Sequence, residues 1–305
     1  MSENTETPPD LESVFLENAF YVTSNLRVVA SQAMKNQLLD GKTDETTKRL
    51  LFLSIHQQLC MAFEDLGSIM LASREKRKGK EFLAVLTNYK GKSADLSELI
   101  RGMADETIAE TYAFGAPVPA LYQKLDYSSE ELQRSAANFT NYVKSLAGMQ
   151  IDRGRICNKL KHAGTALYLP GSPNVISILD WDKDKKNVQS EGLPYKTSEL
   201  RTFLYAIAAC SAVYKDIAFW QLAHCYSEVA EKLLHEPAFQ ESHERTNKLI
   251  YAELDEMKRL NGVRRYRHSV GVQIPPSAPS TRRSFRFSRL ATLASKKPTW
   301  CQHFS

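Results

Sequence analysis

This 305-residue chain lacks the usual signs of cysteine or metal chemistry. The histidines have no metal-binding spacing, and His56, inside a predicted helix, is interpreted as structural. The cysteines are odd in number and no two have Cys-x-x-Cys spacing: Cys60, Cys157, Cys210, Cys225 and Cys301. We therefore expect reduced thiols rather than a disulfide framework or a cysteine zinc site. The sequence predicts neither a metal nor a cofactor.

Long apolar segments are also missing. Residues 1–12 are polar and acidic, unlike a secretory signal. The longest apolar stretch, residues 203–214, contains a serine and is shorter than the roughly 20 residues that cross a bilayer. We interpret it as a buried helix, and we expect a cytoplasmic protein without a membrane partner.

Acidic residues are absent from the last 45 positions, which contain nine Lys or Arg. Since the whole chain carries +5, residues 1–260 carry −4. Residues 263–305 are therefore predicted to be a disordered basic tail. Residues 271–279 (GVQIPPSAP) read like one frame of the 3′ part of a transfer-RNA gene, so we favour translational read-through. The alternative is a nucleic-acid-binding arm.

Familiar site motifs are missing or incomplete. Neither Gly-x-Ser-x-Gly nor Gly-x-Gly-x-x-Gly occurs, and the basic run at residues 74–80 lacks the pattern of a phosphate loop. Residues 180–191 have the acidic spacing of part of a calcium loop, but Lys185 stands where the sharp turn needs glycine. We interpret residues 74–80 as a basic loop end and residues 180–191 as a solvated loop between a strand and a helix.

Apolar residues recur at steps of three and four through most of the chain, which predicts amphipathic helices. Asp10 and Asp44 are predicted N-caps, and residues 1–9 are predicted to be disordered. The runs at 165–169 and 174–181 flank the turn sequence PGSP, which predicts a hairpin near 165–181. The predicted fold, over residues 10–260, is an all-α helical bundle with one inserted β-hairpin. Its helices are expected at 10–39, from 44 to the run at 74–80, around 81–89 and 94–114, and at 129–162, 198–234 and 239–260.

The end of the helix predicted at 129–162 carries the main candidate site. At 100° per residue, Arg155, Asn158, Lys159 and His162 share one face, roughly opposite Leu160 on the apolar stripe. Such a cluster can bind a phosphate and transfer a proton. A structural interpretation competes, because cations favour the negative end of a helix dipole and Gly164 suits a helix stop.

The segment NKLKHAG at residues 158–164 resembles the Asn-Lys-(Ile/Leu)-Lys-His-(Gly) segment of bacterial proteins in the HEPN superfamily, the higher eukaryotes and prokaryotes nucleotide-binding proteins. That superfamily has an Arg followed by four to six residues and a His, a spacing that Arg155 and His162 satisfy. Cys157 departs from the pattern, because the commonest spacing has the Arg directly before Asn158. The resemblance implies a helical bundle and, for many members, a metal-independent ribonuclease in toxin–antitoxin or phage-defence systems.

The resemblance also implies roles for individual residues. His162 would be the general acid/base, Arg155 would bind the phosphate, and Asn158 would orient the phosphate or the histidine. Lys159 and Lys161 would add positive potential for RNA. Two copies would meet as a homodimer to form the cleft, and an antitoxin or another protein would be the regulatory partner. Glu64 or Asp65, in the second helix, are candidates to orient Arg155.

A second interpretation remains open. The same bundle would be a non-catalytic interaction module that binds a partner protein or a nucleotide, with the polar face as a docking surface or a solvated helix end. Cys157, in the place of the adjacent arginine, favours this alternative.

Overall fold

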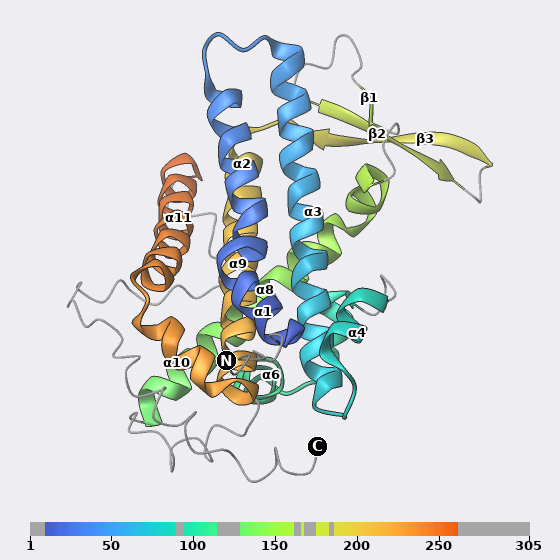
Figure 1. The fold of residues 1–305 in the computed structure, drawn as a ribbon. Helices are drawn as coiled ribbons and strands as arrows, with labels where there is room; N and C mark the ends of the chain where they lie inside the picture. Colours follow the sequence, from blue (N-terminus) through green and yellow to red (C-terminus); the bar gives the residue numbers. More distant parts are fainter. Residues whose placement is uncertain are drawn as a thin grey trace, which may run out of the picture.

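The computed structural model describes residues 10–89, 94–114, 129–161, 166–167, 175–182 and 186–261. These residues form a bundle of helices with a small antiparallel sheet at one side (Figure 1), which confirms the predicted all-α class. The elements run in the following order: α1 (Leu11–Asn18), the π-helical turn η1 (Ala19–Thr23), α2 (Ser24–Leu39), α3 (Glu45–Lys76), α4 (Phe82–Asn88), α5 (Leu96–Leu99), α6 (Asp105–Ala109), the π-helical turn η3 (Glu110–Phe114), α8 (Ser129–Lys161), β1 (Ala166–Leu167), β2 (Val175–Asp182), β3 (Asn187–Pro194), α9 (Thr197–Cys225), α10 (Ser227–His235) and α11 (Pro237–Asn261).

Aspartate caps begin the first two long helical segments, as predicted. The Asp10 side chain accepts a hydrogen bond from the amide of Glu12, and the Asp44 side chain accepts one from the amide of Thr47. These bonds satisfy amides that have no partner inside the helix. Figure 1 shows α2 and α3 side by side, joined by the short connection at residues 40–44.

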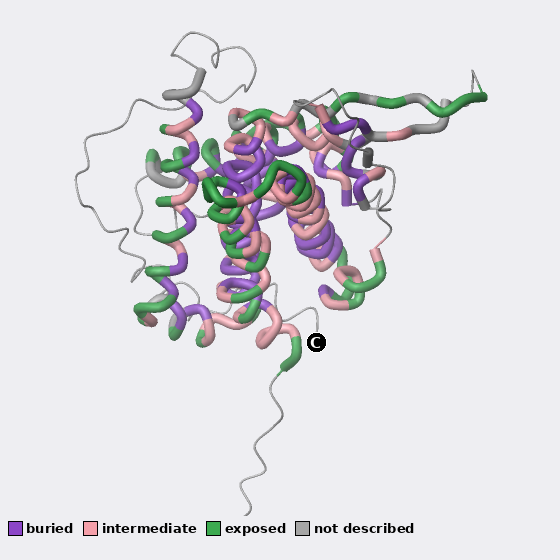
Figure 2. The backbone as a smooth tube through the Cα atoms, turned by 90° about the horizontal axis from the view of Figure 1, so that it is seen from above, coloured by how far each residue is buried: buried purple, intermediate pink, exposed green. Residues whose placement is uncertain are grey.

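The apolar stretch of the sequence lies in α9, which is the central helix of the bundle. α9 packs against α2, α3 and α11, and Phe203, Ile217 and Leu222 on it are fully buried. In Figure 2 the buried residues line the inner sides of the helices. By length and composition α9 could cross a membrane, but 83% of its most apolar window is buried inside the protein. This is the placement of a core helix, as the sequence predicted.

The sheet confirms the predicted hairpin and adds a strand. β1 pairs with β2 in antiparallel register, with Ala166 opposite Ile178. β2 also pairs with β3 along its whole length, although residues 180–191 were expected to be a solvated loop. β3 escapes detection because its sequence is largely polar, and main-chain pairing with β2 rather than an apolar face defines it. Asp180 lies opposite Gln189 in this ladder, and Asp182 and Glu191 of the calcium-like pattern also lie on paired strands.

Two predicted helical segments are interrupted. Around residues 94–114 the chain forms α5, α6 and η3, and Gly102 between them has a φ of 71°, which glycine adopts without strain. The segment at 198–234 breaks at Tyr226, whose hydroxyl donates a hydrogen bond to the Asp10 carboxylate. Pro237 begins α11, two residues before the predicted start at residue 239, because the first turn of a helix tolerates a missing amide hydrogen.

Candidate functional site

Helix α8 carries the candidate motif in its last two turns. It is continuous over 33 residues, and its predicted apolar stripe packs into the core at Ala136, Phe139, Val143 and Leu146. It contacts α3, α5, α6 and α9. The backbone of the motif is therefore part of an element fixed by packing along most of its length.

The core-facing side of the last two turns is well defined. Ile156, Cys157 and Leu160 are buried, with 6–9% of their surface exposed. Helical geometry places positions 155 and 158 about 150° around the axis from the centre of these three. The backbone thus puts Arg155 and Asn158 on the arc of α8 away from this part of the core, as the sequence predicted.

The remaining predicted site residues divide into two groups. Lys159 is half-buried on α8, and Lys161 is the last residue of that helix. His162, the predicted acid/base, lies outside the described residues, directly after the end of α8. The structure therefore brings the backbone of Arg155, Asn158 and the two lysines together in the last two turns of α8.

A second arginine on α8, Arg153, has a structural role. Its guanidinium forms an ion pair with Glu199 on α9 and lies 5.3 Å from the ring centroid of Phe203. Both interactions attach α8 to α9. Sequence reasoning missed this residue because its acidic and aromatic partners are 46 and 50 positions away along the chain.

The acidic residues proposed to orient Arg155 lie on α3, and one of them has a different partner. Asp65 pairs with Arg27 on α2, with 3.0 Å between its Oδ2 and the arginine Nε. Burial raises the pKa of Asp65, and the bond to Arg27 opposes that shift. Asp65 is thus engaged on the α2 side of α3.

The basic run at residues 74–80 is organised around one carboxylate. Glu75 is buried and binds Lys78 and Lys80 at 2.7 Å and 2.6 Å, and it also pairs with Arg74. Hydrogen bonds from the two lysines lower the pKa of Glu75 to about 2. Glu75 thus holds three of the five basic side chains of the run at the end of α3, in agreement with the predicted basic loop end.

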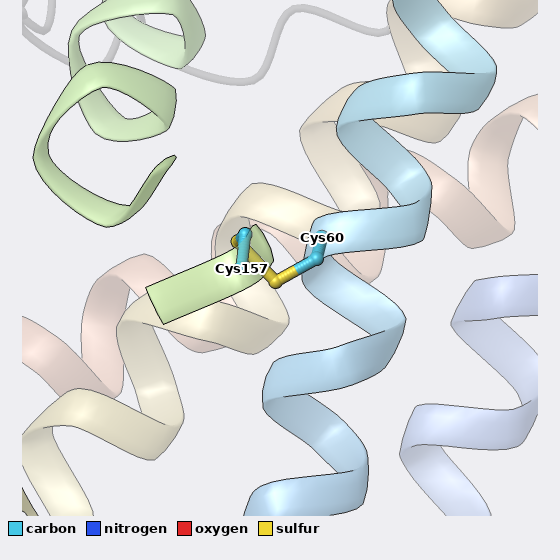
Figure 3. Close-up of a disulfide and its surroundings, with 2 residues drawn as sticks. All are labelled: Cys60 and Cys157. Atoms are coloured by element: carbon cyan, nitrogen blue, oxygen red, sulfur yellow. A yellow bond between two sulfur atoms is a disulfide. The ribbon is translucent and has the colours of Figure 1, made fainter. Parts of the chain in front are cut away.

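The thiol prediction is wrong for one pair of cysteines. Cys60 on α3 and Cys157 on α8 form a disulfide, with 5.3 Å between their Cα atoms (Figure 3). The two residues are 97 positions apart, so only the packing of α3 against α8 brings them together. Among the cysteines in the described part of the chain, Cys210 and Cys225 are outside any disulfide, the first buried and the second exposed.

His56 lies beside this disulfide, one helical turn before Cys60. The side-chain donor atoms of His56, Cys60 and Cys157 all lie within 4.8 Å of one another. The imidazole has no exposed surface, and neither of its nitrogens has a hydrogen-bond partner among the described residues. Its ring stacks on Phe203 at 4.5 Å between centroids. Burial lowers the pKa of His56 to about 3, so the ring is neutral at ordinary pH.

Comparisons with known proteins identify no relative of this chain. No family model matches it, and no curated protein or solved structure is detectably similar to it.

Proposed function

We propose that this protein is a HEPN-like, metal-independent endoribonuclease of the toxin or phage-defence type, acting in the cytoplasm. The observation that carries the proposal is the motif from Arg155 to His162 at the end of a continuous helix. The buried residues of that helix end anchor its opposite side in the core. A fixed helix is a suitable support for a phosphate-binding group.

The proposed reaction needs no metal. His162 would take the proton from a ribose 2′-hydroxyl, whose oxygen then attacks the adjacent phosphorus. The leaving 5′-oxygen would receive a proton from an imidazolium, supplied by a second copy of the motif in a homodimer. An imidazole suits both steps because it titrates near pH ~6.5 when unperturbed. Arg155 would bind the phosphate and stabilise the charge of the transition state.

The other residues of the helix end would assist. Asn158 would orient the phosphate or the imidazole, and Lys159 and Lys161 would raise the local concentration of RNA through positive potential. Burial of Cys157 supports Arg155 as the phosphate ligand, because an arginine at position 157 would point into the core. A protein antitoxin would be the regulatory partner.

One observation favours a second candidate function. The position before Asn158, where the resembling family most often has arginine, is covalently attached to α3 through Cys157. Because position 157 has a structural role here, the chain is also compatible with a non-catalytic module that binds a partner protein or a nucleotide.

The test is RNA cleavage by purified protein. We expect wild-type protein to cut single-stranded RNA in EDTA, and His162→Ala and Arg155→Ala to lose about 10²–10⁴ of the rate, the usual contribution of a general acid/base. The disulfide-bonded protein is the sample for the EDTA experiment, because its sulfurs cannot bind a metal.

Matched controls are available on the same fold. Arg134 is exposed on α8, near its other end, and His235 is exposed at the end of α10. Arg134→Ala and His235→Ala should retain full activity. Absence of cleavage across several RNAs, or full activity in His162→Ala, would remove the enzymatic proposal and leave the interaction module. Unfolding of both motif variants would show that the cluster is structural.

A further inference from the structure

The group formed by His56, Cys60 and Cys157 has no role in the proposed cleavage. It lies in the core between α3 and α8, and all three side chains are at least 94% buried. Its unusual member is the imidazole, because both ring nitrogens are buried without a hydrogen-bond partner among the described residues. Burying polar atoms in this way costs free energy, and native proteins rarely leave such atoms unsatisfied.

We propose that His56, Cys60 and Cys157 form a binding site for one zinc ion when the two cysteines are reduced. His56 and Cys60 are four residues apart on α3, so one helix face presents both donors. Cys157 approaches from α8 and completes the set (Figure 3). Donor atoms already within 4.8 Å of one another need only a small movement to surround a single ion.

The donor chemistry fits zinc. Two thiolates and one neutral imidazole are soft to borderline ligands, which favour Zn²⁺ over Mg²⁺ or Ca²⁺. Two thiolates also cancel the charge of a divalent cation, which is important in an apolar core where a net charge is costly. Three protein ligands leave one tetrahedral position for a water molecule.

The environment prepares the imidazole for a metal. Phe203 stacks on one side of the His56 ring and holds its plane, and Arg153 lies over the same phenylalanine. Coordination would give one of the two orphaned nitrogens a partner, which the disulfide form does not.

The disulfide and the zinc site are then two oxidation states of one group. Oxidation of the zinc form by hydrogen peroxide would take two electrons from the sulfurs, form the S–S bond and release Zn²⁺. The peroxide, with two protons, would become two water molecules. A dithiol would reverse the sulfur chemistry by giving two electrons and two protons and becoming a disulfide itself. Either state links α3 to α8 one residue before Asn158.

The experiment uses the full chain, reduced with a phosphine and freed of metal. Titration with Co²⁺, a spectroscopic substitute for Zn²⁺, should give thiolate-to-cobalt charge-transfer absorption that saturates at one ion per chain, and Zn²⁺ should displace it. The disulfide-bonded chain should give no such absorption. Zn²⁺ should raise the melting temperature of the reduced chain and not that of the disulfide-bonded chain.

Variants assign the ligands. His56→Phe keeps an aromatic ring on Phe203, and Cys157→Ser removes one sulfur. Each should weaken Co²⁺ binding at least ~100-fold, since even the loss of an outer-shell partner costs about 10–100-fold. Cys225→Ser, at an exposed thiol outside the cluster, should bind as wild type does.

Two results would overturn the proposal. The first is a reduced wild-type chain that binds no stoichiometric Co²⁺ or Zn²⁺, which would leave the group as a disulfide only. The second is unchanged binding in His56→Phe, which would place the metal elsewhere. The wild-type titration decides the question even if a variant does not fold.

Discussion

At the scale of single residues, Lys215 shows how the bundle accommodates a charge in its core. It is fully buried on α9, and its ammonium donates hydrogen bonds to the Ser242 carbonyl and hydroxyl, both at 2.9 Å, and to the Thr246 hydroxyl at 2.7 Å. Burial lowers the pKa of Lys215 to about 8. Because all three of its donor positions are occupied inside α11, the lysine holds α9 to α11 rather than activating the serine.

His243, next to this cluster, should make the protein sensitive to acid. Burial, assisted by the charge of Lys215, lowers the pKa of His243 to about 4 from 6.5. Between these values the unfolded chain binds a proton that the folded chain does not, so stability falls as the pH drops below 6.5. His243→Phe, which keeps a ring beside Phe20, should therefore gain about 2–3 kcal/mol relative to wild type between pH ~7.5 and pH ~4.5.

Urea unfolding of both proteins at the two pH values measures this difference. His235→Phe, at an exposed histidine, is the control and should follow the wild-type pH dependence. Equal pH dependence in His243→Phe and wild type would show that the half-buried imidazole does not resist protonation.

At the scale of elements, Gly67 allows the close approach of α3 to the backbone of Ala94, just before α5. A Cβ at this position would lie 1.7 Å from the carbonyl oxygen of Ala94, which is backbone and cannot turn aside. Gly148 on α8 is also helical, but a Cβ there would meet nothing within 4 Å. Substitution at Gly67 thus tests a steric clash, whereas substitution at Gly148 tests helix propensity alone.

Alanine substitutions at these glycines should have opposite effects. Gly67→Ala should destabilise the fold by at least ~2 kcal/mol, because overpacking outweighs the helix propensity gained. Gly148→Ala should stabilise it by about 0.5–1 kcal/mol. Thermal unfolding followed by circular dichroism measures both. A stable Gly67→Ala protein would mean that α3 and residue 94 are further apart than described.

The disulfide between α3 and α8 should also contribute to the free energy of unfolding. The disulfide closes a loop over a sequence separation of 97 residues, so it restricts the unfolded chain strongly. Reduction in the presence of a chelator should cost about 2–4 kcal/mol of unfolding free energy. The double variant Cys60→Ala, Cys157→Ala should be insensitive to reductant. If reductant leaves the wild type unchanged, the two sulfurs are not joined in solution.

The sequence predicted elements where the controlling interactions are local. Asp10 and Asp44 act on amides two and three residues away, and the stripe of α8 follows directly from helical periodicity. The prediction from the sequence failed where the bounds of an element depend on residues far away in the chain. The break at Tyr226 involves Asp10, which is 216 positions earlier, and β3 depends on pairing with β2.

The candidate site follows the same rule. The common arc of Arg155 and Asn158 was predictable, because it is a property of one helix. The donor group of His56, Cys60 and Cys157 was not, since neither cysteine spacing nor histidine spacing reveals how α3 packs against α8. The sequence shows which residues share a helix face, and only tertiary packing shows which faces meet.

At the scale of the whole molecule, charge is divided between two parts of the chain. Residues 1–260 carry −4, while residues 263–305 contain nine Lys or Arg and lie outside the described residues. Part of the positive charge of the bundle is paired inside it. The buried carboxylate of Glu253 forms ion pairs with Lys35 at 2.8 Å and with Arg201 at 2.9 Å. RNA binding by the bundle would thus depend on a local cluster such as the end of α8.

Deletion of residues 263–305 tests whether the basic segment contributes to that binding. If the segment is a product of read-through, the truncated protein should melt at the same temperature as the full chain and should bind and cut RNA equally well. The prediction follows from the buried core, which the described residues up to Met257 on α11 already provide.

The salt dependence of RNA affinity distinguishes the two interpretations of residues 263–305, translational read-through and a nucleic-acid-binding arm. A nucleic-acid-binding arm would displace counterions from the RNA when it binds. Its removal would then make the plot of log affinity against log salt shallower, by about 0.7 for each phosphate that the arm neutralises on single-stranded RNA. With nine basic residues, an arm that neutralised about four phosphates would change the slope by about three. An unchanged slope after truncation supports read-through, whereas a much shallower slope and a weaker affinity would establish the arm and assign RNA binding to the tail instead of α8.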